Sequence, residues 1–334
     1  MPLRLSVFLC LAVACSKTPV LAADAAETVP APGKPIALPS QLVEDRFFVS
    51  PVSSDGQKLE LFTDTGGGLF LMEETAQRLK LAMEELPSEE SKTGKFTVVR
   101  LPGFQPGAGI PPVTGGEGMI PVAPAAKASR PPKELMGDGM LGQSWFAERV
   151  WTFDYPGGRL WWRAPGDVPG VDASHRVSLG FPVNRQGGRA ANFPRIQVTV
   201  DGETLDLLFD TGATVLLTDA ALQALGDGRP AARATSFITR STFERWHQRH
   251  PDWRVIEDAD KNLPGAALIE VPEVEVAGYK VGPVGFTTRP DKNFHEYMSR
   301  MMDKQVEGAL GGSALHFFRV TVDYPNAVAA FEKP

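Results

Sequence analysis

The strongest constraint on how this chain can fold is an internal repeat. The triplet Asp-Thr-Gly stands at Asp64–Gly66 and again, 146 positions later, at Asp210–Gly212. A second pair of blocks is spaced by 169 positions: Gly139–Pro156 lies over Gly308–Pro325, and 8 of these 18 ungapped positions are identical. Whole segments that recur in the same order indicate two homologous units within one chain.

Each triplet stands where a predicted buried strand gives way to a turn. The preceding runs, Leu59–Thr63 and Leu205–Phe209, are mostly apolar, and glycine permits the tight turn that follows. Two carboxylates presented by two such turns could share one proton and activate one water molecule. Asp64 and Asp210 are therefore the candidate catalytic residues, and this chemistry needs no metal ion and no other cofactor.

The order of motifs in each half, Asp-Thr-Gly, Gly-x-Leu-Gly-x-Ser and Asp-Tyr-Pro, resembles the retropepsin-like and pepsin-like aspartic peptidases over residues 45–334. Bacterial exported retropepsin-like proteins are the most similar, here with both halves in tandem. The resemblance implies a mostly β, bilobal acid-protease fold of two retropepsin-like β-barrel lobes with pseudo-two-fold symmetry. It also implies an aspartic endopeptidase that hydrolyses peptide bonds with water held between Asp64 and Asp210.

The same resemblance assigns supporting roles in the two catalytic loops. Thr65 and Thr211 match threonines whose hydroxyls bond across the lobe interface. Gly66 and Gly212 match glycines whose amides approach the carboxylates, and Thr214 matches a residue whose hydroxyl supports the outer carboxylate oxygen.

Two departures from the family pattern leave other functions open. The first copy continues with Gly67 and Gly68, which offer no hydroxyl, and no tyrosine lies between Asp64 and Asp154 to match the flap tyrosine of pepsins. One alternative is a non-catalytic exported peptide-binding protein with a degenerate aspartic-protease cleft. Another is that second lobes pair across a homodimer, although a monomer built as an internal pseudo-dimer is the main expectation.

The repeat also divides the chain into expected domains. Arg163–Asp172 is rich in proline and glycine and separates the two copies, so it is predicted to be the linker. The expected units are a signal peptide at 1–22, a flexible leader at 23–39, a first lobe at 40–162, a linker at 163–177 and a second lobe at 178–334.

Spacing and composition predict the irregular segments. Because the offset grows from 146 to 169 between the two blocks, the second lobe is expected to carry an insertion at about 226–264. The stretch 101–132 is so rich in proline and glycine that it is expected to form neither a regular helix nor a central strand. It occupies the position of the first lobe's flap, where a mobile cover and a surface insertion are equally good interpretations.

Local patterns predict strands more often than helices. Alternation of apolar and polar residues favours half-buried strands at Arg195–Val200 and Val271–Val276. Short helices are expected at Glu73–Met83 and Asp219–Leu225. Among the other polar motifs, Asp154 and Asp323 are expected to cap turns, and His247 and His250 are expected to be solvated, because no glutamate completes a metal-binding pattern.

The N-terminus has the layout of an export signal. Arg4 precedes an apolar run, Leu5–Ala14, and small residues around Ala22 provide a cleavage site. The protein is therefore expected to be exported, periplasmic or secreted, with lipidation at Cys15 as an alternative. The other cysteine, Cys10, lies in the same segment, so the mature chain is expected to contain no disulfide.

Charge and hydropathy narrow the expected partners. The net charge is −6, which argues against nucleic acid, since binding to phosphates usually needs a basic face. No other apolar stretch reaches the length of a membrane-spanning helix. The expected partner is a peptide or protein substrate.

Overall fold

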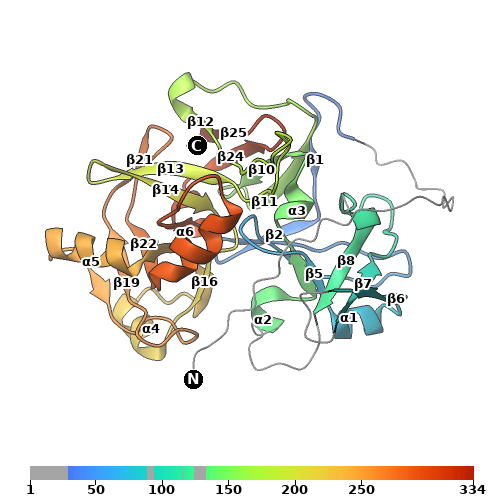
Figure 1. Ribbon diagram of the computed structural model, residues 1–334, viewed down its shortest axis with the longest axis horizontal. Helices are drawn as coiled ribbons and strands as arrows, with labels where there is room; N and C mark the ends of the chain where they lie inside the picture. The colour runs from blue at the N-terminus through green and yellow to red at the C-terminus, as the bar shows by residue number, and fades with distance from the viewer. Residues whose placement is uncertain (1–28, 89–93, 115, 124–132) are drawn as a thin grey trace.

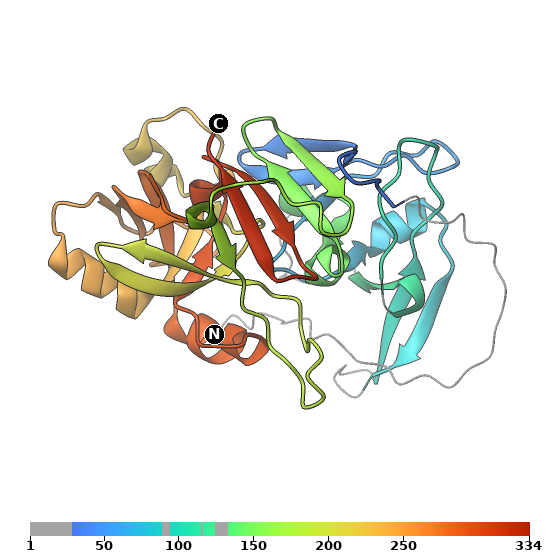
Figure 2. The ribbon, with the colours of Figure 1, turned by 90° about the horizontal axis from the view of Figure 1, so that it is seen from above.

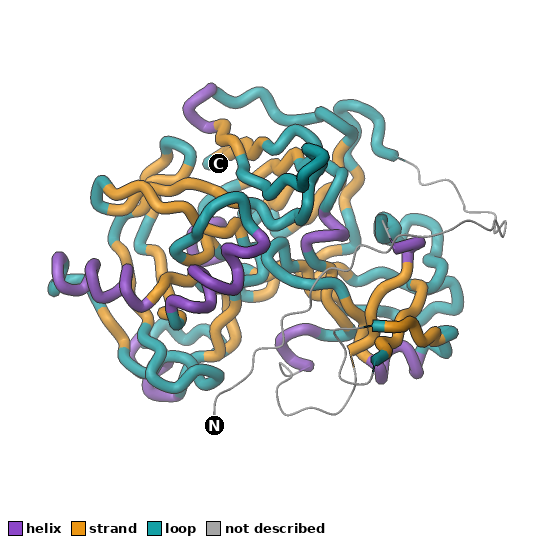
Figure 3. The backbone as a smooth tube through the Cα atoms, viewed as in Figure 1, coloured by secondary structure: helices purple, strands orange, loops and turns teal. Residues whose placement is uncertain are grey.

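The computed structural model describes residues 29–88, 94–114, 116–123 and 133–334. Strands and loops dominate and the helices are short (Figure 3), so the prediction of a mostly β chain is confirmed. The predicted signal peptide and the start of the predicted leader lie outside the described residues. Within the described segments, no helix is long and apolar enough to cross a membrane.

An eight-stranded sheet carries the first repeat, blue to green in Figure 1. Its central strands are rich in aromatic and aliphatic residues, which favour a pleated, buried surface. In spatial order the strands are β2 (Ser40–Val43), β3 (Arg46–Val49), β4 (Leu61–Thr63), β9 (Gly139–Leu141), β5 (Phe70–Met72), β8 (Met119–Ala123), β7 (Lys95–Arg100) and β6 (Met83–Pro87).

A nine-stranded sheet carries the second repeat, yellow to red in Figure 1. In spatial order its strands are β21 (Tyr279–Val281), β20 (Val274–Val276), β13 (Arg195–Val200), β14 (Glu203–Phe209), β23 (Gly308–Leu310), β17 (Ser236–Thr239), β22 (Val284–Arg289), β19 (Leu268–Val271) and β18 (Val255–Ile256). The strand predicted at Arg195–Val200 is β13. The one predicted at Val271–Val276 is interrupted at Pro272, where β19 has ended and β20 has not begun.

The two sheets share one topology over six strands. The order β4-β9-β5-β8-β7-β6 in the first repeat corresponds to β14-β23-β17-β22-β19-β18 in the second. The pairing sense also agrees at each step, with β4 parallel to β9 and β14 parallel to β23, then β5 antiparallel to β9 and β17 antiparallel to β23. The duplicated sequence blocks thus fold into the same strand arrangement.

This correspondence shows that the insertion in the second repeat lies at a different position from the predicted one. Phe70 lies opposite Met140, and Phe237 lies opposite Ala309, so β17 is the counterpart of β5. The extra residues therefore fall at 214–234, directly after Ala213, and the prediction of about 226–264 places the insertion too far along the chain. This insertion contains a two-stranded sheet of β15 (Thr214–Leu216) and β16 (Ala232–Ala234), with helix α4 (Asp219–Leu225) between them.

A six-stranded sheet joins the two repeats, and we call it the seam sheet. Its order is β1 (Ile36–Ala37), β11 (Arg159–Arg163), β10 (Val150–Asp154), β24 (Arg319–Asp323), β25 (Val328–Glu332) and β12 (Arg176–Ser178). Strands β10 and β24 pair antiparallel, so the green hairpin β10–β11 lies beside the red hairpin β24–β25 in Figure 2. The repeat-equivalent residues Thr152 and Thr321 face each other, and their hydroxyl oxygens are 2.6 Å apart.

The helices are short. They are α1 (Glu73–Arg78), α2 (Lys133–Met136), α3 (Gln143–Phe146), α4, α5 (Arg240–Arg249) and α6 (Gly312–Leu315), with short helical turns η1 (Gly116–Gly118), η2 (Ala173–His175), η3 (Asn293–Met298) and η4 (Ser299–Met301). Helix α4 has the predicted bounds because Thr218 caps its first turn and Gly226, with φ of 64°, ends it. The helix predicted at Glu73–Met83 is shorter, since Met83 already begins β6.

Two other expectations about the fold are wrong. Strand orders run from one edge to another, so the described residues form open sheets and not the predicted β-barrels. The proline-rich stretch 101–132 contributes β8, which lies between β5 and β7 as a central strand. Pro121 is tolerated because β5 pairs only with Val122 and Ala123, so no N–H is required from the proline on that side.

Candidate functional site

Equivalent strands of the two repeats, β4 and β14, end directly before Asp64 and Asp210. Each aspartate follows a strand that runs parallel to the Gly-x-Leu strand of its own repeat, and its N–H donates to the leucine carbonyl, of Leu141 and Leu310 respectively, at 3.0 Å. Each carboxylate then accepts a hydrogen bond from a backbone N–H of its own turn. Gly66 N–H donates to Asp64 Oδ1 at 2.9 Å, and Gly212 N–H donates to Asp210 Oδ1 at 3.0 Å.

Threonine side chains tie the two turns to each other. The Thr65 hydroxyl donates to the Phe209 carbonyl at 2.7 Å and accepts from the Thr211 N–H at 3.0 Å. In return, the Thr65 N–H donates to the Thr211 hydroxyl at 3.2 Å. Both threonines are fully buried. These crossed bonds hold the turns at a fixed separation.

Glycine is required in both triplets because the opposite carboxyl group is so near. A Cβ added to Gly66 would lie 2.6 Å from Cγ of Asp210, and one added to Gly212 would lie 2.1 Å from Cγ of Asp64. Asp64 and Asp210 therefore face each other across the two turns. They are 9% and 7% exposed, so the pair is largely withdrawn from water.

Burial and proximity make the pair share a proton. Burial raises the pKa of Asp64 well above its usual value, and the negative charge and hydrogen bond of Asp210 raise it further. Burial also raises the pKa of Asp210, but the hydrogen bond from Asp64 and the amides of Gly212 and Ala213 lower it. The pair therefore holds one proton between its two carboxyls, and the titration belongs to the pair as a unit.

The hydroxyl expected to support a carboxylate is turned away. Thr214 Oγ1 donates to the Gly212 carbonyl at 2.8 Å, which is a local turn contact. The structural counterpart of Gly68 is Thr235, because a Cβ on Gly142 would meet Gly68 O at 1.9 Å and one on Gly311 would meet Thr235 O at the same distance. The Thr235 hydroxyl lies 2.8 Å from the hydroxyl of Thr287.

Sequence reasoning missed the residue that explains Gly67. A Cβ at Gly67 would lie 2.4 Å from Asp64 Oδ2 and 2.6 Å from Met140 Sδ. In the second repeat the corresponding positions are Ala213 and Ala309, a larger residue in the turn and a smaller one in the strand. Within the repeated sequence block, Met140 aligns with the smaller Ala309. This difference was the sequence signal that a small residue in one turn accompanies a large residue in the neighbouring strand.

Two tyrosines of the repeated Asp-Tyr-Pro motif lie near the pair. The hydroxyls of Tyr155 and Tyr324 are buried, with no hydrogen-bond partner among the described residues. Burial raises the pKa of both, and the charge of Asp210 adds to this for Tyr155 and that of Asp64 for Tyr324. The aspartates before them cap turns as predicted, Asp154 accepting from Gly157 N–H and Asp323 from Asn326 N–H, each at 3.0 Å.

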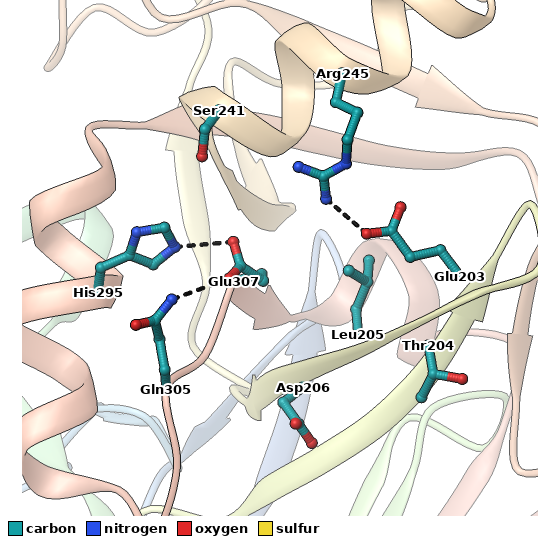
Figure 4. A pocket seen from close by; sticks show the side chains of 9 residues that line it. All are labelled: Glu203, Thr204, Leu205, Asp206, Ser241, Arg245, His295, Gln305 and Glu307. Carbon is teal, nitrogen blue, oxygen red and sulfur yellow. Dashed lines mark hydrogen bonds and ion pairs between the residues drawn. The ribbon is translucent and has the colours of Figure 1, made fainter.

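A polar pocket of about 360 Å³ lies at the other end of β14 (Figure 4). Two pairs of its charged or titratable groups contact each other: His295 Nε2 lies 2.8 Å from Glu307 Oε2, and Arg245 donates to Glu203 Oε1 at 2.7 Å. Asp206 pairs instead with Arg195, which lies outside the lining. The lining residues are Glu203, Thr204, Leu205, Asp206, Ser241, Arg245, His295, Gln305 and Glu307. The pocket therefore involves neither aspartate of the pair.

The histidines of α5 do not converge. His247 stacks on Phe243 with ring centroids 5.9 Å apart, whereas His250 Nε2 lies 2.8 Å from Asp201 Oδ2. In the part of the chain that the structure describes, no three histidine, cysteine, aspartate or glutamate side chains are grouped so that they could hold a metal ion.

Comparison with known proteins gives structural matches only. No protein-family model matches the sequence, and neither does any curated protein. The chain is similar to conglutin gamma, a basic 7S globulin from lupine seeds, with 11% identity and a TM-score of 0.47 over 91% of this chain and 96% of that one. It is also similar to the basic 7S globulin from soybean, with 10% identity and a TM-score of 0.46 over 90% and 94% of the two chains.

These matches correct the predicted family and activity. Both solved structures are named as globulins, and neither is named as a peptidase. The comparisons thus return globulins where the sequence predicts a retropepsin-like or pepsin-like aspartic peptidase, active as an endopeptidase, and they do not bear out that prediction. The physical reason for the error is that the threonines and glycines of the triplets are needed to pack the two turns together, whether or not water is activated between the aspartates.

Asp64→Asn is expected to remove part of the pH dependence of stability. Because folding raises the pKa of both carboxyls, the stability that the pair contributes is fully present below their unfolded values and is lost as pH rises through the raised values. The variant should thus be more stable than the wild type by about 1–2 kcal/mol at neutral pH and show no gain near about pH 4. Urea unfolding at both pH values measures this difference.

The exposed Asp219 provides the matched control. Its pKa is lowered by Lys261, so its contribution has the opposite sign and is lost as pH falls. Asp219→Asn should leave the stability at neutral pH close to that of the wild type. An equal gain for Asp64→Asn at both pH values would contradict the shared proton.

Proposed function

We propose that the protein is a non-catalytic exported protein that binds a peptide segment between two lobes related by an approximate two-fold axis. The observation that carries the proposal is the buried carboxyl pair, which two equivalent turns present face to face. The matching strand orders of the two sheets support the two-lobed organisation. Export rests on the sequence pattern of residues 1–22, and N-terminal sequencing of the protein from separated cell fractions tests it.

The chemistry of the pair suits a peptide group. With one shared proton, the pair offers one O–H donor on one carboxyl and carboxylate acceptors on the other. A peptide group presents the complement, a C=O acceptor and an N–H donor. Hydrogen bonds to an ionised group in a desolvated site are stronger than neutral ones, so the pair could anchor a peptide without reacting with it.

The surroundings of the pair support binding over hydrolysis. Hydrolysis needs a carboxylate held ready as a base, with a water molecule fixed beside it. The first turn has Gly68 where a supporting hydroxyl would stand, and in the second turn Thr214 bonds Gly212 O instead of a carboxylate. Both aspartates are also less than 10% exposed, at 9% and 7%.

A binding and cleavage assay on one peptide mixture tests this function. We expect no cleavage of denatured casein or of labelled peptides between acidic and neutral pH, together with saturable binding by fluorescence polarisation. Asp210→Asn removes one carboxyl of the pair, and with it the negative charge that the pair carries, and should weaken binding at least about tenfold, because a charged hydrogen bond contributes about 1.5–3 kcal/mol. Asp219→Asn is the control and should bind as the wild type does.

Two results would overturn the proposal. The first is peptide cleavage by the wild type that Asp210→Asn abolishes, which would make the pair catalytic after all. The second is an absence of binding to every peptide in the mixture by a folded wild-type protein.

A further inference from the structure

Arg46 is a buried cation with almost no partners. The residue is 3% exposed, and its Nε and Nη1 atoms are buried without a hydrogen-bond partner among the described residues. The remaining nitrogen, Nη2, lies 3.4 Å from the Ala232 carbonyl, a long contact. The guanidinium carbon also lies 5.5 Å from the ring centroid of Phe48, so one face of the group rests on an aromatic side chain.

Such an arrangement is costly unless an anion completes it. Removing a charged group from water without a partner costs several kcal/mol in proteins, and burial accordingly lowers the pKa of Arg46. Glu44 opposes this effect through its charge, but its carboxylate accepts a hydrogen bond from Arg229 Nε at 2.9 Å. The charge of Glu44 is therefore shared between two arginines.

Strand pairing places Arg46 at the same end of the sheet as the carboxyl pair. Strand β3 runs antiparallel to β4, with Phe48 opposite Phe62, so Arg46 begins β3 at the end where β4 turns into Asp64. The preceding turn, Glu44–Asp45, also reaches the second repeat. A Cβ added to Gly312 would lie 2.4 Å from Asp45 O.

The insertion at 214–234 covers Arg46. Its strand β16 supplies the Ala232 carbonyl, and the N–H of Ala234 donates to Glu44 O at 2.9 Å. Arg229, which belongs to this insertion, forms ion pairs with Glu44 at 2.9 Å and with Asp45 at 2.8 Å. We call the insertion the cover. Arg229 is 42% exposed, and ion pairs in contact with water contribute little. The ion pairs of Arg229 therefore add little to the attachment of the cover at this edge.

We propose that Arg46 is a carboxylate-binding site, closed by the insertion at 214–234, that takes a carboxylate of the bound peptide. This inference rests on the proposed function, because the peptide that reaches Asp64 is the source of the anion. The guanidinium is always charged, presents a planar set of donors and forms short charge-assisted hydrogen bonds with carboxylates. The anion would use the two nitrogens that have no partner in the described protein.

Three forms of one short apolar peptide test the site. The first has an amidated C-terminus and no acid, the second adds one internal aspartate, and the third has a free C-terminal carboxylate. We expect the wild type to bind one of the two acidic forms at least about tenfold more tightly than the neutral form, the value of one charged hydrogen bond. The form that is preferred identifies a side chain or a chain terminus as the source.

Arg46→Met keeps an unbranched side chain as far as the position of Nε and removes the guanidinium charge. This variant should bind all three peptides with the same affinity, close to that of the wild type for the neutral form. Arg249→Met removes an exposed arginine paired with Asp201 and is the matched control, which should keep the wild-type preference. A preference that survives in Arg46→Met would overturn the proposal.

A peptide-free measurement separates this proposal from the proposed function. Thermal unfolding in sodium acetate and in sodium chloride of equal ionic strength should show a higher midpoint in acetate for the wild type and equal midpoints for Arg46→Met. If no peptide binds but acetate stabilises only the wild type, the proposed function fails while the anion site stands. Equal acetate effects in both proteins would mean that Arg46 holds no carboxylate, and the site would be rejected.

Discussion

Gly142→Ala should destabilise the protein by about 4 kcal/mol or more, at the upper end of single-substitution effects. A Cβ at this position would lie 1.9 Å from the Gly68 carbonyl oxygen and 2.3 Å from that of Gly67. Both contacts are with backbone atoms of the first aspartate turn, so no side chain can rotate away. Thermal and urea unfolding followed by circular dichroism measure the loss.

A glycine without neighbours provides the control for this substitution. Gly170 has no atom within 4 Å of an added Cβ and no positive φ, so Gly170→Ala should change stability by less than about 0.5 kcal/mol. Gly311→Ala should behave like Gly142→Ala, because its Cβ would lie 1.9 Å from Thr235 O. Wild-type unfolding of Gly142→Ala would show that the turn and the Gly-x-Leu strand are not in contact.

Phe153→Ala should cost about 3–5 kcal/mol, the usual cost of truncating a fully buried phenylalanine. Phe153 is fully buried in β10, and its ring centroid lies 5.5 Å from that of Phe146, 6.0 Å from that of Phe47 and 6.1 Å from that of Phe209. Phe209 belongs to the second repeat and directly precedes Asp210. The cavity would therefore open between the two repeats.

Denaturant unfolding with two probes measures this effect. Tryptophan fluorescence and circular dichroism should report one shared transition, moved to lower denaturant in the variant. Tyr297, which is 43% exposed, provides the control, and Tyr297→Ala should have an effect within about 0.5 kcal/mol. A loss below about 1 kcal/mol for Phe153→Ala would contradict the packing of the two repeats against each other.

Features that depend on local sequence were predictable. Alternation gave the strand at Arg195–Val200, and a threonine cap with a following glycine set the bounds of Asp219–Leu225. The triplets likewise placed Asp64 and Asp210 at strand ends. In each case the residues that carry the signal also make the contacts that fix the structure.

Features that depend on pairing between distant segments were not predictable. The insertion was misplaced because Leu71 and Gln77 match Leu217 and Gln223, and both segments are a strand followed by a short helix. Only the pairing of β17 with β23 shows that Phe237 is the counterpart of Phe70. Activity was not predictable for a related reason, since the motif determines how the two turns pack and does not determine whether water is activated between the aspartates.

The seam sheet also has a consequence for how the protein is made. Its central contact joins Thr152 to Thr321, 169 residues apart, and contacts of such long sequence separation form slowly. Until β24 has been synthesised, β10 presents an unpaired edge that carries Trp151 and Phe153, and unpaired edges of this kind recruit other strands. Since β24 is the repeat counterpart of β10, a nascent first half would find its best substitute in a second nascent first half. Newly made chains are therefore at greatest risk of pairing with each other before their own second halves appear.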